Sequence, residues 1–345
     1  MMKSYFPTLF GNDGSKSRIG ALIASGRVPH AFLIDGPQGS GKLTYAKLIS
    51  SALNCEARDD GNSPLPCGKC NNCRRIGENG FVDVKILERD RDKATLGVND
   101  IKAFRNDMYM TATESDYKIY IIRDAERLTP EAQNSLLIVL EEPPKNVIIM
   151  LLASGTDKIL TTIKSRAQYI PMSRFTDKEL SDLVVDKSSE AAALLRSDPD
   201  RFGILMRLSD GVIGKALRLT DRRQSEETSE EYGRIMGIIE ALSPKVGYSV
   251  LYGRLSELPT KRDELQSALE ELMLGIRDMI IMRNCDKGQP LFFTDKARAR
   301  ALGREIGHKR LLAFYDIIND AHSDNTKNAN VNTLIINLGA RLKMC

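Results

Sequence analysis

Ala31-Phe-Leu-Ile-Asp-Gly-Pro-Gln-Gly-Ser-Gly-Lys-Leu-Thr44 is the stretch that decides the fold of this chain. It predicts an apolar strand, a glycine-rich turn, and a helix that begins at Lys42. The turn fits the phosphate-binding pattern G-x-x-x-x-G-K-[ST] through Gly36, Gly41 and Lys42. Leu43, however, stands where the pattern requires a hydroxyl. We therefore expect the architecture of a phosphate-binding domain in which one chemical group is missing.

Each residue type in the turn has a separate role in holding phosphate. Glycines let the main chain point N–H groups at phosphate oxygens, and the helix dipole adds positive charge. Lys42 supplies a charge to the β- and γ-phosphates, whereas the missing hydroxyl would bind Mg²⁺. Thr44 lies about 100° further round the helix and is a poor substitute. The alternative is a glycine turn without a ligand. The predicted degenerate nucleotide site comprises Gly36, Gly39, Ser40, Gly41, Lys42, Leu43 and Thr44.

The composition is that of an ordinary globular protein. The 345 residues allow two or three domains of roughly 100–200 residues each. Fifty basic and 46 acidic residues give a net charge of +4, which by itself does not indicate a nucleic-acid-binding protein. No signal peptide and no stretch of about 20 apolar residues is present. We expect a cytoplasmic protein that does not enter a membrane.

Four cysteines cluster directly after the phosphate-loop helix, at 55, 67, 70 and 73, with the spacing C-x11-C-x2-C-x2-C. Two-residue spacers let neighbouring thiolates face one ion, and four thiolates make a closed tetrahedral zinc site with no open position for catalysis. The alternatives are free cysteines or an iron–sulfur cluster. We predict structural zinc held by Cys55, Cys67, Cys70 and Cys73, and ordinary thiols at Cys285 and Cys345.

The order of predicted strands and helices indicates an α/β fold with a parallel five-stranded sheet over residues 1–172. The predicted strands span 31–34, 82–87, 117–122, 146–153 and 168–171. The cysteine insertion at 55–73 interrupts this domain. From Thr176 onwards the sequence predicts only helices: several short helices over 173–222, a polar linker over 221–231, and an all-α domain over 223–345 for association. Its longest helices are expected at 261–283 and 295–320.

A second magnesium-handling position is altered at the end of the strand 117–122. A nucleotide hydrolase is expected to present Asp there for Mg²⁺ and then an acid that polarises water. Arg123 occupies the first place and has the wrong sign of charge, and Asp124 occupies the second. We therefore predict that the protein has no ATPase activity of its own. Binding of ATP or ADP without hydrolysis is left open, because Lys42 and the glycines are kept.

Taken together, these motifs resemble the bacterial clamp-loader subunits of DNA polymerase III, which belong to the AAA+ class. The resemblance covers nearly the whole chain. It is carried by the phosphate loop, the four-cysteine insertion, Asn134-Ser-Leu-Leu-Ile-Val-Leu-Glu-Glu-Pro143 and Ser165-Arg166. Leu43 and Arg123 make the chain more similar to the delta-prime type than to the gamma/tau motor type. Lys215 matches the place of the second-sensor arginine of the motors.

The resemblance implies a delta-prime-like stator in a pentameric ring that uses ATP to load a sliding clamp onto primed DNA during replication. The implied partners are the gamma/tau and delta subunits, the clamp and primer–template DNA. It also implies that Arg166 acts in trans, as an arginine finger on the ATP of a neighbouring subunit. The C-terminal helices would form the collar of the ring.

Two other functions are compatible with parts of the sequence. The first is an ATP-hydrolysing gamma/tau-type motor, with Asp124 as the catalytic acid and Thr44 recruited for Mg²⁺. The second is a small-molecule kinase, which would need a substrate lid and a second acid–base cluster. The helical C-terminal half offers neither, so the stator is the favoured hypothesis.

Overall fold

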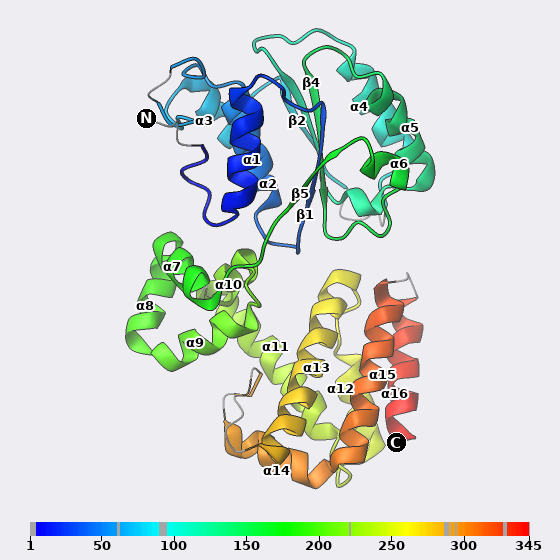
Figure 1. Cartoon of the computed structure of the whole chain (residues 1–345). Helices are drawn as coiled ribbons and strands as arrows, with labels where there is room; N and C mark the ends of the chain where they lie inside the picture. Colours follow the sequence, from blue (N-terminus) through cyan, green and yellow to red (C-terminus); the bar gives the residue numbers. More distant parts are fainter. Residues whose placement is uncertain are drawn as a thin grey trace. The chain divides into compact units, whose positions relative to one another are not determined.

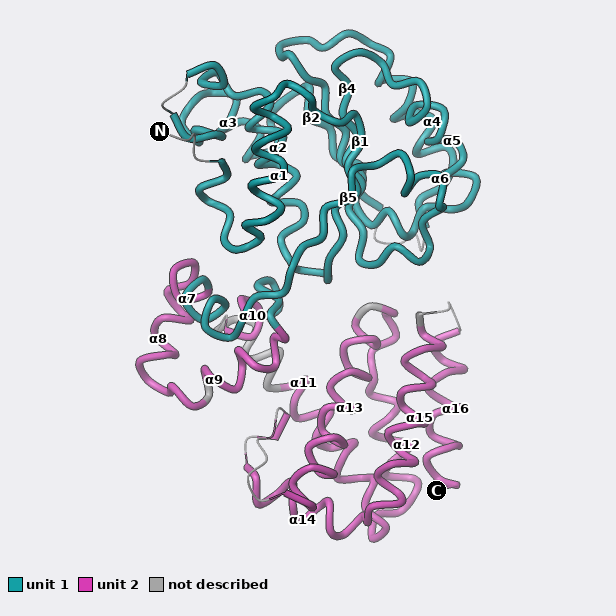
Figure 2. Tube along the Cα trace, in the orientation of Figure 1, with its two compact units in different colours: residues 1–183, 211–215 teal, residues 184–210, 216–345 magenta. Residues whose placement is uncertain are grey.

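The structure is a computed structural model that describes residues 5–60, 63–89, 95–220, 222–285, 290, 292–293, 295–326 and 330–344. The chain forms two compact units, shown in different colours in Figure 2. Unit 1 consists of residues 1–183 and 211–215, and unit 2 of residues 184–210 and 216–345. The finer division into domains at 172 and 222 stays a prediction.

Unit 1 is an α/β layer structure, and its elements follow the predicted order. They are α1 (Asp13–Ala24), β1 (Ala31–Asp35), α2 (Lys42–Leu53), α3 (Asn71–Gly77), β2 (Val84–Leu87), α4 (Val98–Met108), β3 (Lys118–Ile122), the 3-10 turn η1 (Ala125–Arg127), α5 (Pro130–Glu141), β4 (Val147–Ala153), α6 (Thr161–Lys164) and β5 (Gln168–Pro171). The five strands are parallel, in the order β2-β3-β4-β1-β5. The predicted parallel five-stranded sheet is confirmed.

Helices cover both faces of this sheet. Figure 1 shows α1, α2 and α3 on one face and α4, α5 and α6 on the other. Each face has its own apolar core, because alternate residues of a strand point to opposite sides. Strand β4 is buried along its whole length, as the unbroken apolar run 147–153 predicts for a central parallel strand. The carboxyl ends of β1, β3 and β4 therefore meet at one edge, beside the glycine turn.

Beyond the sheet the described residues form only helices, as predicted. They are α7 (Asp177–Lys187), α8 (Ser189–Ser197), α9 (Pro199–Leu208), α10 (Ile213–Thr220), α11 (Arg222–Ala241), α12 (Tyr248–Ser256), α13 (Arg262–Asn284), α14 (Lys296–Ile306), α15 (His308–Thr326) and α16 (Val331–Lys343). Helix α7 begins with the predicted capping box, in which Thr176 and Glu179 exchange hydrogen bonds. Helices α11 to α16 share one large apolar core. None of the described helices is long and apolar enough to cross a membrane.

Two predictions for the helical region are wrong. The stretch 222–231 is the start of α11 and not a linker. Its Glu, Arg and Gln residues are good helix formers, and polarity alone does not distinguish a solvated helix from a linker. The single helix predicted over 295–320 is two helices, α14 and α15. Gly307 separates them with a φ of 88°, which is a left-handed conformation that favours glycine.

A half-buried charge network links α4 to the sheet. The Asp107 carboxylate accepts hydrogen bonds from Tyr120 Oη at 2.5 Å and from Lys85 Nζ, which lies 2.8 Å away. Lys118 Nζ lies 3.2 Å from the same carboxylate oxygen. Burial alone would raise the pKa of Asp107. The hydrogen bonds from Lys85, Tyr120 and Lys118 outweigh burial and hold this pKa at about 2.

This network predicts a specific acid sensitivity. Because the folded-state pKa of Asp107 lies below its ordinary value of 3.8, its stabilisation is complete above that value and is lost as the pH falls towards 2. Asp107→Asn should lower the free energy of unfolding at neutral pH by about 1–2 kcal/mol and flatten its pH dependence in this window. Urea unfolding at several pH values measures both effects. Asp157→Asn, at an exposed position, is the control, and equal slopes for the two variants would contradict the prediction.

Candidate functional site: the phosphate loop and its surroundings

The glycine turn has the backbone shape that its sequence predicts. Gly39 and Gly41 have φ values of 83° and 92°, which only glycine adopts without strain. Helix α2 begins at Lys42, directly after Gly41. The Lys42 amine donates hydrogen bonds within its own loop, to Gly36 O at 2.6 Å and Pro37 O at 3.0 Å. The lysine and the glycines are thus brought together as a phosphate cradle requires.

The side chains of the predicted loop residues Ser40, Leu43 and Thr44 lie in different environments. Leu43 packs against the apolar core on the α2 face of the sheet, and Thr44 is exposed to solvent. Ser40 is 6% exposed, and its Oγ has no hydrogen-bond partner among the described residues. The side chain after Lys42 therefore completes the core and carries no metal ligand.

The end of strand β3 carries an ion pair at the place expected for a magnesium ligand. Arg123 Nη1 lies 2.6 Å from Glu88 Oε1, just beyond the end of β2. Asp124 follows in a left-handed conformation, with a φ of 51°, and precedes the turn η1. Arg123 thus neutralises the nearby acid Glu88, and it offers no ligand to a cation.

Two residues that the sequence motifs do not indicate, Ser154 and Glu126, lie near the lysine. Ser154, directly after β4, accepts a hydrogen bond from Lys42 Nζ at 3.0 Å through its Oγ. The N–H of Ser154 donates to the carboxylate of Glu126. Oxygen Oε2 of Glu126 is buried and has no hydrogen-bond partner among the described residues. The available signal was their position, since each follows the carboxyl end of a strand adjoining the loop.

Burial and neighbouring charges act in opposite directions on the pKa values of Lys42 and Glu126. Burial lowers the pKa of the Lys42 amine, and the carboxylates of Glu126, Asp124 and Asp35 oppose that shift. Burial likewise raises the pKa of Glu126, against the N–H donors of Glu126 itself and Ser154. A phosphate entering the loop must therefore draw Lys42 from carbonyl oxygens and a nearby acid. The residue that follows Lys42 in this loop, Leu43, supplies no hydroxyl.

The start of helix α10 packs directly on the phosphate loop, within unit 1. Gly214 donates its N–H to Gly39 O at 3.0 Å. A Cβ at Gly214 would lie 2.9 Å from Gly39 O and 3.0 Å from Gly39 Cα. The main-chain nitrogen of Lys215 also lies beside Gly39, because a Cβ built at Gly39 would be 3.7 Å from it. The predicted second-sensor position is therefore brought to the loop.

Gly214→Ala is expected to destabilise unit 1. Alanine raises the helix propensity of this position by about 1 kcal/mol. Its Cβ would however press on the main-chain atoms of Gly39, which cannot rotate away. Such overpacking costs about 1–3 kcal/mol. We expect a net loss, measured as a lower denaturation midpoint. Gly14→Ala, in helix α1, is the control, because nothing lies within 4 Å of a Cβ there. An equal or higher midpoint for Gly214→Ala would contradict the contact.

Arg166 lies apart from the phosphate loop's hydrogen bonds, just after helix α6. Its side chain is 37% exposed, and Nη2 lies 3.0 Å from Glu141 Oε1, at the end of α5. Nη1 donates to Thr162 O at 3.1 Å. The predicted arginine is thus accessible from outside unit 1, and it takes no part in the site around Lys42.

The four predicted cysteines come together, and they fit a tetrahedral metal site. Their sulfur atoms all lie within 4.8 Å of one another. Cys67 Sγ and Cys73 Sγ are 4.0 Å apart, close to the roughly 3.8 Å that two 2.3 Å zinc–sulfur bonds give at a tetrahedral angle. The cluster closes the insertion between α2 and α3. Cys285 is a free, exposed thiol, and Cys345 lies outside the described residues.

The main chain around the cysteines is arranged to stabilise thiolates. Cys70 N donates to Cys67 Sγ and Cys73 N to Cys70 Sγ, both at 3.4 Å. Burial alone would raise the pKa of Cys67, but N–H donors, chiefly that of Cys70, outweigh burial and lower this pKa to about 7. Burial raises the pKa of Cys55 and Cys73, which a bound dication would counteract. A metal ion bound by these four thiolates would tie the insertion to the end of α2.

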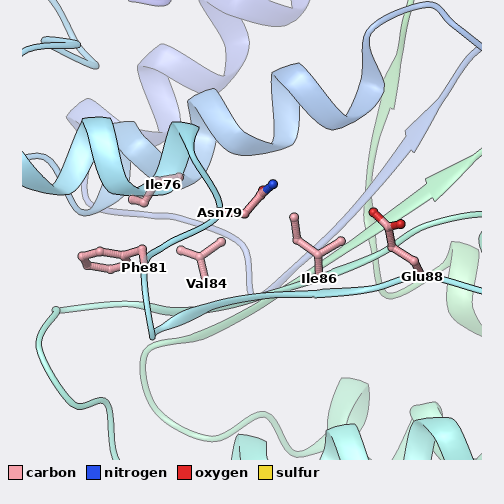
Figure 3. Close-up of a pocket in the computed structure, with 6 residues that line it drawn as sticks. All are labelled: Ile76, Asn79, Phe81, Val84, Ile86 and Glu88. Atoms are coloured by element: carbon pink, nitrogen blue, oxygen red, sulfur yellow. The ribbon is translucent and has the colours of Figure 1, made fainter.

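A cavity of about 280 Å³ lies elsewhere, between α3 and the edge strand β2. Figure 3 shows its lining, with Val84 and Ile86 of β2 facing Ile76 and Asn79. Phe81 and Glu88 complete the lining. Four of the six lining residues are apolar, and none of the six is a lysine or a cysteine. None of the site residues predicted from the sequence lines this cavity.

Comparisons with known proteins agree with these features. Residues 12–176 match the family model described as DNA polymerase III, delta subunit. The delta' subunit of Bacillus subtilis DNA polymerase III is 27% identical over 322 residues, which cover 92% of this chain and 91% of that protein. The gamma/tau subunit of Mycobacterium tuberculosis is 22% identical over 332 residues, which cover 91% of this chain.

The chain spans only 56% of the length of that gamma/tau subunit. A solved gamma subunit-related protein of Thermotoga maritima has a TM-score of 0.44 and 16% identity, with 94% of this chain and 98% of that one covered. The match to the delta' subunit, in contrast, extends over nine-tenths of both proteins. Residues 12–176 thus match a DNA polymerase III delta subunit family model, and the chain is similar over nine-tenths of its length to delta' and gamma/tau subunits of bacterial DNA polymerase III.

Proposed function

We propose that this protein is a delta-prime-type stator of the clamp loader. In this function it hydrolyses no ATP itself and supplies Arg166 to the ATP of a neighbouring gamma/tau subunit. The observation that carries the proposal is the Arg123–Glu88 ion pair at 2.6 Å, which occupies the strand end where a motor needs a magnesium ligand. Leu43, packed in the core, supports it independently.

The expected partners follow from the family. They are the gamma/tau and delta subunits, the sliding clamp and primer–template DNA, in a ring of five subunits. In this proposal α11 to α16 form the collar that holds the ring, and the helices over 173–222 form the lid. Structural zinc is the proposed cofactor, and the phosphate loop is a passive site for ATP or ADP.

The test compares the lone protein with the assembled loader. Purified protein should show no ATP turnover, and it should co-assemble with gamma/tau and delta subunits and complete a DNA-stimulated ATPase. The absence of turnover should hold for the wild type and for Lys42→Ala alike. Failure to assemble with those subunits would refute the stator function.

A gamma/tau-type motor is the second candidate. One observation favours it: Lys42 is kept, and the half-buried acid Glu126 lies close enough to act on its charge. In that case the lone protein should hydrolyse ATP, and Lys42→Ala or Glu126→Gln should abolish turnover. Such a result would replace the stator by the motor.

A further inference from the structure

The ion pair between Arg166 and Glu141 places an acidic side chain at the C-terminus of a helix. Glu141 is the last residue of α5, and Glu142 follows it. Acidic side chains at a helix C-terminus are unfavourable, because they face the negative end of the dipole. A locally unfavourable residue that makes a specific contact is typical of a functional position.

Both ends of the ion pair are held on fixed elements. Gln133 of α5 is 2% exposed and donates to Lys158 O at 2.9 Å, and its Oε1 accepts from Leu160 N at 2.8 Å. These bonds fasten α5 to the segment that leads into α6. The side chains of Glu141 and Arg166 are both partly exposed, so they can change partners without moving these elements.

The Glu141 carboxylate and a phosphate compete for the same guanidinium. A phosphate binds arginine through two parallel hydrogen bonds, and a carboxylate left in contact would repel it. Glu141 and Arg166 are 52% and 37% exposed, and such pairs shift an equilibrium at most about fivefold. The contact is strong enough to bias the arginine and weak enough to open.

We propose that Glu141 is a positioning residue that holds Arg166 on its own domain and releases it to the phosphate of the partner's ATP. The inference rests on the proposed trans function of Arg166. Glu141 thereby keeps ATP hydrolysis low until the neighbouring site closes, and it has little influence once the arginine is fully engaged.

The experiment uses Glu141→Gln in the complete loader, assembled with gamma/tau and delta subunits. The basal ATPase should rise about two- to fivefold, while the maximal rate with clamp and primed DNA stays unchanged. Raising the salt from about 0.05 to 0.5 M should bring the wild-type basal rate towards that of the variant, because salt weakens the exposed pair. Glu142→Gln is the matched control and should behave like the wild type.

The outcomes separate this inference from the one on which it rests. If Arg166→Ala lowers the stimulated rate but Glu141→Gln equals the wild type at every salt concentration, the positioning role of Glu141 is wrong and the trans function stands. If Arg166→Ala also has no effect, the trans function itself fails. A fall of both basal and stimulated rates in Glu141→Gln would also overturn the holding role.

Discussion

Replacing Arg166 by alanine is expected to lower the hydrolysis rate at the neighbouring ATP site by about 10³-fold or more. A guanidinium placed on the transferring phosphoryl group would neutralise charge that develops in the transition state. Single-turnover measurements of the assembled loader, with clamp and primed DNA, resolve this one site from the others. ATP binding by the complex should change much less than the rate.

Two further variants sharpen this result. Arg166→Lys keeps the charge but loses the planar fork of donors, so it should recover only a small part of the rate. Arg27→Ala removes an exposed arginine elsewhere in unit 1 and should leave the rate unchanged. An unaltered single-turnover rate in correctly assembled Arg166→Ala loader would rule out the trans role of this residue.

Replacing Cys73 by serine is expected to have the largest effect on stability. The apparent free energy of zinc binding to small modules is about 10–16 kcal/mol. Even a fraction of this value exceeds the free energy of unfolding of many domains. The loss should spread beyond the insertion. Phe6 N donates to Leu65 O at 2.8 Å, and the fully buried Phe6 ring packs edge-on against Tyr45 of α2, with the ring centroids 5.5 Å apart.

The measurements are metal content and the thermal midpoint, each with and without a chelator. Wild-type protein should hold one zinc per chain and lose several kcal/mol of stability when the metal is removed. Cys285→Ser is the control, because Cys285 is exposed and lies outside the cluster. Stoichiometric iron and sulfide would identify an iron–sulfur cluster in place of zinc. A thermal midpoint that does not change when chelator is added would exclude a structural metal.

The predictable part of the fold is the part coded by local chemistry. All residues of the run 147–153 are apolar, so neither face of this strand can be exposed to solvent and its burial is expected. Thr129 caps α5, and Pro130 at its first position starts the helix as its sequence predicts. The two errors, at 222–231 and 295–320, have local causes as well. A polar helix resembles a linker, and one glycine can end a helix inside an unbroken pattern.

The site was predictable where residues are close in sequence. The glycine loop and the cysteine cluster depend on short spacings, so their members could be named in advance. Glu126 was missed, because its meeting with Lys42 depends on how β3 lies in the sheet. Glu141 was missed as a partner of Arg166 for the same reason, since α5 and α6 pack together only in the folded unit.

The sequence by itself determined the elements, the parallel sheet, the phosphate loop and the absence of a hydroxyl after Lys42. These follow from side-chain periodicity and turn chemistry, which act within a few residues. Only the tertiary structure decided where Leu43 packs, which acid neutralises Arg123, and which carboxylate holds Arg166. Those contacts join segments brought together by strand order and helix packing, and no local pattern encodes the distance between them.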